Sequence, residues 1–142
     1  MSEGEELEVV QVPQPETALI VLGDAMVFQP SNQVLSVTIN RREDLANSIT
    51  GAARYSLETV HVVMRSKDIN TLYDPGAIID FQPYLKSGGE VTLHALTDSQ
   101  AGTRRADEEE LATLKSSLAI AGLKIISENE EDASTTITAR NE

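Results

Sequence analysis

The sequence predicts a single α/β domain with an open sheet of about six strands, of which only the last runs antiparallel to its neighbours. Six short segments rich in β-branched residues alternate with segments of helical periodicity, an order typical of parallel strands joined by helices. The last two strand segments are joined by "NEEDA", which is short enough for an antiparallel hairpin. A chain of 142 residues is long enough for one domain with a hydrophobic core and too short for two comfortable ones.

The expected strands are short and bounded by turn formers. The first and third are nearly continuous apolar runs, as in strands that helices cover on both faces. The second and fourth mix small polar residues into the run, so we expect one face of each to be less deeply covered. Only "GDAMVFQPSN" separates the first two strands, and this leaves room for at most one turn of helix. The six predicted strands are residues 17–22, 33–39, 59–64, 90–96, 123–128 and 134–139.

The clearest helix is predicted over residues 107–122. Asp107 can cap its first turn, and Glu110 follows at the spacing of a capping box. Gly122 suits the position that ends a helix. Helix 107–122 and the segment 75–86 would form helical crossover connections between strands of the sheet. The expected buried face of helix 107–122 comprises Leu111, Leu114, Leu118 and Ala121.

A second helix is predicted over residues 41–55, with Leu45 and Ile49 on one face and Gly51 weakening its end. The third is predicted over residues 75–86, where Asp74 can cap and Pro75 fits the first helical position.

Pro83 should kink or break this third helix near Phe81. After a helix end at Lys86, Gly88 or Gly89 would turn the chain into the strand that begins at Glu90. The expected buried face of this helix comprises Ile78, Ile79, Tyr84 and Leu85.

Charge and composition limit the partners and the compartment. Twenty-three acidic residues against 11 basic ones give a net charge of −12, which repels nucleic acid. No secretion signal and no run of 18 apolar residues occurs, so a cytoplasmic protein without a membrane partner is expected. The absence of cysteine excludes a disulfide framework, a thiolate nucleophile, a zinc ribbon and cysteine-ligated iron–sulfur clusters in this chain. Residues 1–16 are predicted to form a flexible acidic tail, and residues 17–142 the domain.

Residues 59–141 resemble a known family. The order of a helix, "YLKSGGEVTLHAL", an acid-capped helix ending "LAIAGL" and then "KIISENEEDASTTITARN" is similar to the C-terminal half of the class I methyltransferase fold. More closely, it resembles the N-terminal methyltransferase-like domain of the anamorsin family, which acts in cytosolic iron–sulfur protein assembly. The resemblance implies a truncated Rossmann-like sheet in which the first strand is central and the antiparallel last strand lies between its two predecessors.

The sequence lacks the residues of a methyltransferase cofactor site. Such a site needs a glycine-rich turn after the first strand and an acid at the end of the second. Here one glycine, Gly23, is followed by Asp24 and bulky residues, and the second strand is followed by Asn40 and two arginines. Asp24 is therefore expected in a turn or cap role rather than as a cofactor ligand, and no S-adenosylmethionine site is predicted.

No catalytic or metal-ligating residue is predicted either. His61 and His94 could act as acid and base or as half a metal site, but no carboxylate or second histidine lies at ligand spacing beside either in the sequence. They are therefore interpreted as partly buried strand residues that are hydrogen-bonded to neighbours. The acids 107–110 are interpreted as a helix N-terminus rather than a metal site. Three serines lack a nucleophile-elbow context, and two arginine pairs are interpreted as solvated charge. These remaining candidates are Ser36, Ser87, Ser117, Arg41, Arg42, Arg104 and Arg105.

The sequence is compatible with two functions. The favoured one is a monomeric, non-catalytic protein-interaction domain like that of the anamorsin family, and the resemblance implies a diflavin reductase as partner and electron donor. The alternative is a small S-adenosylmethionine-dependent methyltransferase with a degenerate cofactor site. In the family, iron–sulfur clusters are held by cysteines beyond a linker, so the chain is either an excised domain or a free-standing relative.

Overall fold

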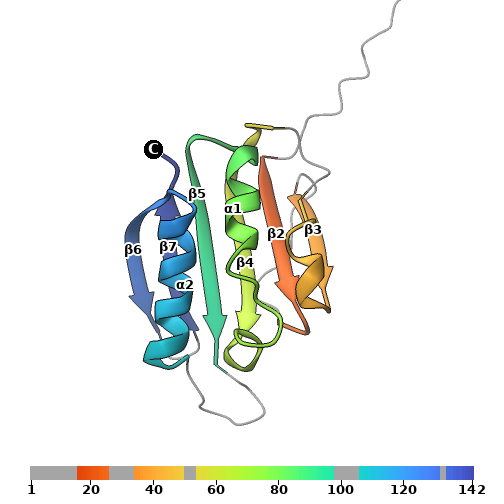
Figure 1. Cartoon of the computed structure of the whole chain (residues 1–142), viewed down its shortest axis with the longest axis vertical. Helices are drawn as coiled ribbons and strands as arrows, with labels where there is room; N and C mark the ends of the chain where they lie inside the picture. The colour runs from red at the N-terminus through yellow and green to blue at the C-terminus, as the bar shows by residue number, and fades with distance from the viewer. Residues whose placement is uncertain (1–15, 26–33, 50–53, 98–105, 132–133) are drawn as a thin grey trace, which may run out of the picture.

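The computed structural model describes residues 16–25, 34–49, 54–97, 106–131 and 134–142. They form one six-stranded sheet in the order β3-β2-β4-β5-β7-β6 (Figure 1). All six predicted strands are present, with ends shifted by a few residues and β5 extended toward its N-terminus. The strands are β2 (Thr17–Leu22), β3 (Val34–Ile39), β4 (Leu57–Arg65), β5 (Leu85–Leu96), β6 (Lys124–Glu130) and β7 (Ser134–Arg140).

Strand directions confirm the expected mixed sheet. β3, β2, β4 and β5 pair in parallel, whereas β7 is antiparallel to both β5 and β6. β7 therefore lies between its two predecessors, and the central position of β2 is also as the resemblance implied. The parallel pairing of β2 with β3 is achieved across a connection shorter than the usual crossover. Most of that connection, residues 26–33, lies outside the described residues, as does nearly all of the predicted acidic tail.

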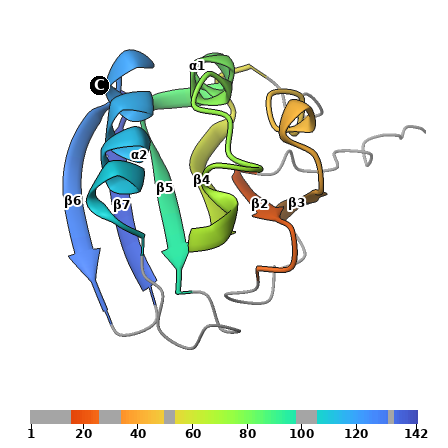
Figure 2. The ribbon, with the colours of Figure 1, turned by 60° about the horizontal axis from the view of Figure 1, so that its bottom comes forward.

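The helices of the described residues lie on one face of the sheet (Figure 2). They are α1 (Ala77–Phe81) and α2 (Glu108–Ile120), with the short 3-10 turns η2 (Arg42–Asp44), η3 (Ser66–Asp68) and η4 (Gln82–Tyr84). None of these described helices is long and apolar enough to cross a membrane.

The prediction of a helix over residues 41–55 is wrong for the part of this range that the structure describes. Only η2 and the turns after it form there. The segment "ANSIT" consists largely of poor helix formers, and the Ser48 hydroxyl donates to the Leu45 carbonyl at 2.7 Å. Leu45 and Ile49 are nevertheless fully buried, as predicted, while Gly51 lies outside the described residues.

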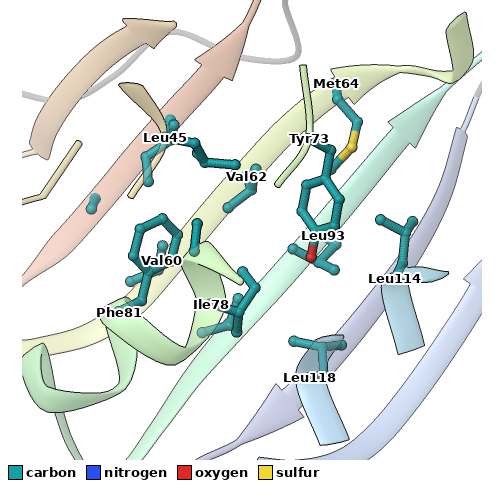
Figure 3. Packing of buried hydrophobic residues seen from close by; sticks show 14 of the residues in the cluster. Leu45, Val60, Val62, Met64, Tyr73, Ile78, Phe81, Leu93, Leu114 and Leu118 are labelled. Atoms are coloured by element: carbon teal, nitrogen blue, oxygen red, sulfur yellow. The ribbon is translucent and has the colours of Figure 1, made fainter. Parts of the chain in front are cut away.

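The main core lies between the sheet and the helices. Ile78 and Phe81 of α1 and Leu118 of α2 are completely buried, and they pack on alternate residues of the central strands such as Val60 and Leu93 (Figure 3). Because strand side chains alternate between faces, a single set of residues from each strand contributes to this layer.

Helix α2 has the ends that its sequence predicts. The Asp107 carboxylate accepts from the Glu110 backbone N–H at 2.8 Å, and the Glu110 carboxylate accepts from the Asp107 N–H at 3.0 Å. This pair is the predicted capping box. At the other end Gly122 has φ +83°, and the Leu123 N–H donates to the Leu118 carbonyl at 3.0 Å, which closes a Schellman motif.

The third predicted helix breaks where Pro83 requires. α1 ends at Phe81, η4 contains Pro83, and β5 begins at once at Leu85. Two details are corrected by this early break. Lys86 belongs to a strand rather than to a helix end, and Ile79, predicted to be buried, is 47% exposed because α1 is only five residues long.

The glycine pair forms a bulge inside β5 rather than a helix cap. Leu57 of β4 lies opposite Leu85, and Thr59 lies opposite Glu90, so the extra residues of β5 must loop out between these pairs. Gly88 supplies the positive φ, +83°, that this path needs.

We predict that Gly89→Ala lowers the free energy of unfolding by about 1–3 kcal/mol, as overpacking does. An added Cβ would lie 2.9 Å from the Lys86 carbonyl oxygen and 3.0 Å from that of Leu57, and neither backbone atom can swing away. The control is Gly76→Ala, because Gly76 has a helical φ of −68° and its Cβ would meet only the Asp74 carboxylate at 3.5 Å. Equal urea midpoints for the two variants would contradict the assigned role of the bulge.

Candidate functional site

The carboxyl ends of the parallel strands are the place where open α/β sheets bind ligands, at the point where strand order reverses. In this chain that point is the end of β2, which has β3 on one side and β4 on the other. The residues that decide what this edge can do are those that follow β2, β3 and β4.

The turn after β2 is packed against the segment that follows β4. Gly23 has φ +66°, and its N–H donates to the Ile39 carbonyl of β3 at 2.8 Å. A Cβ on Gly23 would lie 3.1 Å from the Asp68 carboxylate and 3.4 Å from the Leu72 side chain. The glycine therefore allows close packing of protein on protein at the place where a cofactor-binding turn would approach its ligand.

Asp24 is held by an arginine from the end of β4. The Arg65 Nε donates to Asp24 Oδ1 at 2.8 Å, and the hydrogen bond and charge of Arg65 lower the pKa of the Asp24 carboxyl. The Asp24 side chain remains 68% exposed, whereas that of Arg65 is 18% exposed. The expected turn role for Asp24 is thus seen with an ion-pair partner that lies 41 residues away in sequence.

Asp68 is a buried acid of this edge that the sequence analysis did not single out. It is 9% exposed at the end of η3, and burial raises the pKa of its carboxyl, against a smaller lowering by the charge of Lys67. In "RSKDIN" it looks like an ordinary turn residue, and no local pattern marks it as buried. Its position depends on the approach of Gly23, which only the folded sheet creates.

No acid directly follows β3. Ile39 is followed by Asn40, and the next residue, Arg41, donates from two nitrogens to the two Asp44 carboxylate oxygens, each at 3.1 Å. The stretch after Ala25, "MVFQPSNQ", lies outside the described residues, and its sequence contains no glycine. The residues present at the strand ends therefore do not fit S-adenosylmethionine in the manner of a glycine-rich turn with a ribose-binding acid.

The two histidines come together on the opposite face of the sheet from α1 and α2. His61 Nδ1 lies 2.9 Å from His94 Nε2, with the rings tilted by 39°. Both are partly buried strand residues with a hydrogen-bond partner, as expected, but that partner is the other histidine, which their spacing in the sequence does not indicate. In the parallel pairing of β4 with β5, His61 lies opposite Thr92 and His94 opposite Val63, so the histidines are diagonal neighbours.

Burial determines the protonation of this pair. Both rings are half-buried strand residues, and burial lowers the pKa of His61. Burial and, secondarily, the charge of His61 lower the pKa of His94 to about 4. Both imidazoles are therefore neutral at pH 7.

The other sequence candidates occupy structural positions. Ser117 is buried, donates to the Leu114 carbonyl at 2.7 Å and contacts the Tyr73 hydroxyl, while Ser36 and Ser87 are exposed strand residues. Residues 107–110 form the N-terminus of α2 with its cap, and residues 104–105 lie outside the described residues. Within the described part of the chain, no group of three or more histidine, aspartate or glutamate side chains is placed to hold a metal.

A polar hollow of about 420 Å³ lies beside the β5 bulge, at the amino end of the aligned part of β4 and β5. Among the described residues that line it, the cation is Lys86, which is bound by Glu16 at 2.9 Å and Glu58 at 3.1 Å. The two carboxylates more than offset the charge of this lysine, so these residues do not present a net positive charge to an anion.

Comparison with known proteins supports the fold alone. No family model and no curated protein matches the sequence. Among solved structures, Methanococcus jannaschii fibrillarin, a pre-rRNA processing protein, is similar over 91% of this chain and 68% of its own, at 11% identity and a TM-score of 0.51. A SAM-dependent methyltransferase from Aquifex aeolicus is similar over 91% of this chain and 84% of its own, at 10% identity and a TM-score of 0.52.

A third similar structure is geranyl diphosphate C-methyltransferase from Streptomyces coelicolor, at 10% identity and a TM-score of 0.51. The similarity covers 78% of this chain but only 52% of that enzyme, so the chain spans about half its length. Together with the strand order, these matches show a methyltransferase-like Rossmann fold.

Proposed function

We propose that this chain is a non-catalytic protein-interaction domain with a methyltransferase-like fold. The observation that supports this function is the arrangement at the carboxyl ends of β2, β3 and β4. Where a methyltransferase approaches its cofactor with backbone, Gly23 packs on Asp68 and Leu72, and Asp24 is paired with Arg65. Among the described residues, no group of three or more histidine, aspartate or glutamate side chains is placed to hold a metal at this edge.

The finer proposal is a role like that of the anamorsin N-terminal domain in cytosolic iron–sulfur protein assembly. It rests on the resemblance of residues 59–141 and on the strand order that the resemblance implied. Such a domain would hold cluster-bearing sequence near a diflavin reductase and raise the effective concentration of one for the other. A net charge of −12 favours a basic patch on that partner and a salt-sensitive rate of encounter.

A second candidate is a methyltransferase with a degenerate cofactor site. It is favoured by the fold shared with a SAM-dependent methyltransferase. The two functions differ in one measurable property, the affinity of this chain for S-adenosylmethionine.

The first test is calorimetric titration with S-adenosylmethionine and S-adenosylhomocysteine. For the non-catalytic domain we expect the dissociation constants of both compounds to exceed about 1 mM, so that binding is less favourable than about −4 kcal/mol. The Aquifex aeolicus enzyme serves as the positive control for the titration. A tighter constant together with methyl transfer to any acceptor would replace the proposal by the enzyme.

The second test measures binding to a purified diflavin reductase at low and high salt. We expect association that weakens steeply toward 1 M salt, where the screening length falls to about 3 Å. A folded protein of similar negative charge controls for non-specific attraction. If no binding is seen at low salt, the anamorsin-like role is contradicted, and the proposal of an α/β interaction domain stands with a different partner.

A further inference from the structure

From the His61–His94 pair we propose a site for a divalent transition-metal ion, copper(II) or nickel(II), on the face of the sheet that lies opposite α1 and α2. The site does not rest on the proposed function, since it uses residues remote from the carboxyl ends of the strands.

The rigidity of the sheet holds the two ligands in place. His61 lies near the middle of β4, flanked by Leu19 of β2 and Thr92 of β5. His94 lies in β5, flanked by Val63 of β4 and Thr136 of β7. Both strands have a hydrogen-bonded neighbour on each side, so the separation of the two backbones cannot drift as it would in a loop.

The polar character of this part of the face suits a hydrated ion. Beside the histidines, Thr92 and Thr138 bond through their hydroxyl oxygens at 3.1 Å, and Thr136 lies next to His94. The histidine rings are half-buried, so one side of each is in reach of solvent. An ion bound here can keep water molecules in its remaining coordination positions.

The distance between the two nitrogens is short enough for one ion to bind both, and it is nearer to the spacing of a square-planar site than to that of a tetrahedral one. Imidazole nitrogens bind such metals at about 2.0–2.1 Å, and two nitrogens 2.9 Å apart then subtend an angle of about 90° at the metal. This angle is the cis angle of square-planar and tetragonal sites, which copper(II) and nickel(II) prefer. A tetrahedral zinc ion would need the two nitrogens about 3.3 Å apart. Binding breaks the hydrogen bond between the two rings: the ring that donates it moves its proton to its other nitrogen, and each ring rotates so that both lone pairs point to one centre.

The ligand type favours the same ions. Neutral imidazole nitrogens are good ligands for copper and nickel. Hard cations such as magnesium prefer oxygen ligands and should not compete.

The test is titration of the whole chain with copper(II) and nickel(II) chloride in a weakly coordinating buffer at neutral pH, with magnesium as the negative control. We expect one ion per chain, tighter binding of copper(II) than nickel(II), and no binding of magnesium. His61→Gln and His94→Gln should each weaken copper(II) binding by at least about tenfold, because each leaves a single imidazole. Ser36→Ala, at an exposed residue of β3 on the same face but two strands away from His61, is the matched control and should bind as the wild type does.

Far-UV circular dichroism first establishes that each variant is folded. If a histidine variant does not fold, the electron paramagnetic resonance spectrum of the wild-type copper(II) complex decides, since two bound imidazoles give superhyperfine splitting from two nitrogens. A spectrum without two imidazole nitrogens, a stoichiometry other than one, or unchanged affinity in both histidine variants would overturn the site.

Discussion

Replacement of Phe81 by alanine is expected to lower the free energy of unfolding by about 3–5 kcal/mol. Phe81 is completely buried at the last position of α1, where its ring packs into the main core beside Val60 (Figure 3). α1 is only five residues long and has no side-chain cap, so it cannot be stable by itself. The buried ring therefore holds the helix to the sheet, and its loss leaves a cavity that the short helix cannot fill. Such a cost is a large part of the 5–15 kcal/mol that is typical of a domain.

The matched control is Ile79→Ala in the same helix. Ile79 is 47% exposed, so its truncation removes little buried surface, and alanine is the better helix former. We expect a change within about 1 kcal/mol. Urea unfolding followed by far-UV circular dichroism measures both variants, and a loss for Ile79→Ala as large as that for Phe81→Ala would show that the core does not depend on this helix face.

The architecture was predictable because it depends on patterns that repeat along the chain. Strand segments such as 17–22 and 134–139 are recognised by composition and by the turn formers around them, and a short connection enforces the β6–β7 hairpin. Asp107, Glu110 and Gly122 act within a few residues of their own position, so both ends of α2 could be predicted from local chemistry.

The predictions failed where tertiary packing overrides a local pattern. Leu45 and Ile49 have helical spacing and both are buried, yet the segment that carries them forms only a 3-10 turn and a following turn. Gly88 and Gly89 were expected after a helix, because a glycine pair has the same local signature in a helix cap and in a bulge. Only the pairing with β4 shows that extra residues must loop out.

The contacts at the candidate site could not be predicted from the sequence. The missing glycine-rich turn and acid can be read from the residues after β2 and β3. The groups that fill this edge come from another part of the chain: Arg65 reaches Asp24, and Asp68 approaches Gly23. The histidine pair has the same origin, because His61 and His94 are 33 residues apart and meet only through the register of two strands.

The second large effect is expected at alkaline pH and comes from Tyr73. Its side chain is completely buried in the core, its hydroxyl bonds to that of Ser117, and burial raises the pKa of its phenol above the value near 10 that holds in the unfolded chain. Above pH 10 the unfolded chain loses the Tyr73 proton while the folded chain keeps it. The contribution of Tyr73 to stability is therefore fully present below pH 10 and is lost above it, by up to about 1.4 kcal/mol per pH unit.

Tyr73→Phe should separate this effect from other alkaline titrations. At pH 8 the variant loses about 1 kcal/mol with the hydrogen bond, since the Ser117 hydroxyl still donates to the Leu114 carbonyl at 2.7 Å and is not left without an acceptor. Above pH 10 the variant lacks the Tyr73 proton release, so its stability falls less steeply and the two curves should meet near pH 11. Tyr55→Phe, at a side chain that is 62% exposed, is the control and should follow the wild type throughout. Urea unfolding at pH 8, 10 and 11 gives the comparison, and parallel curves for wild type and Tyr73→Phe would show that the Tyr73 phenol ionises without unfolding the core around it.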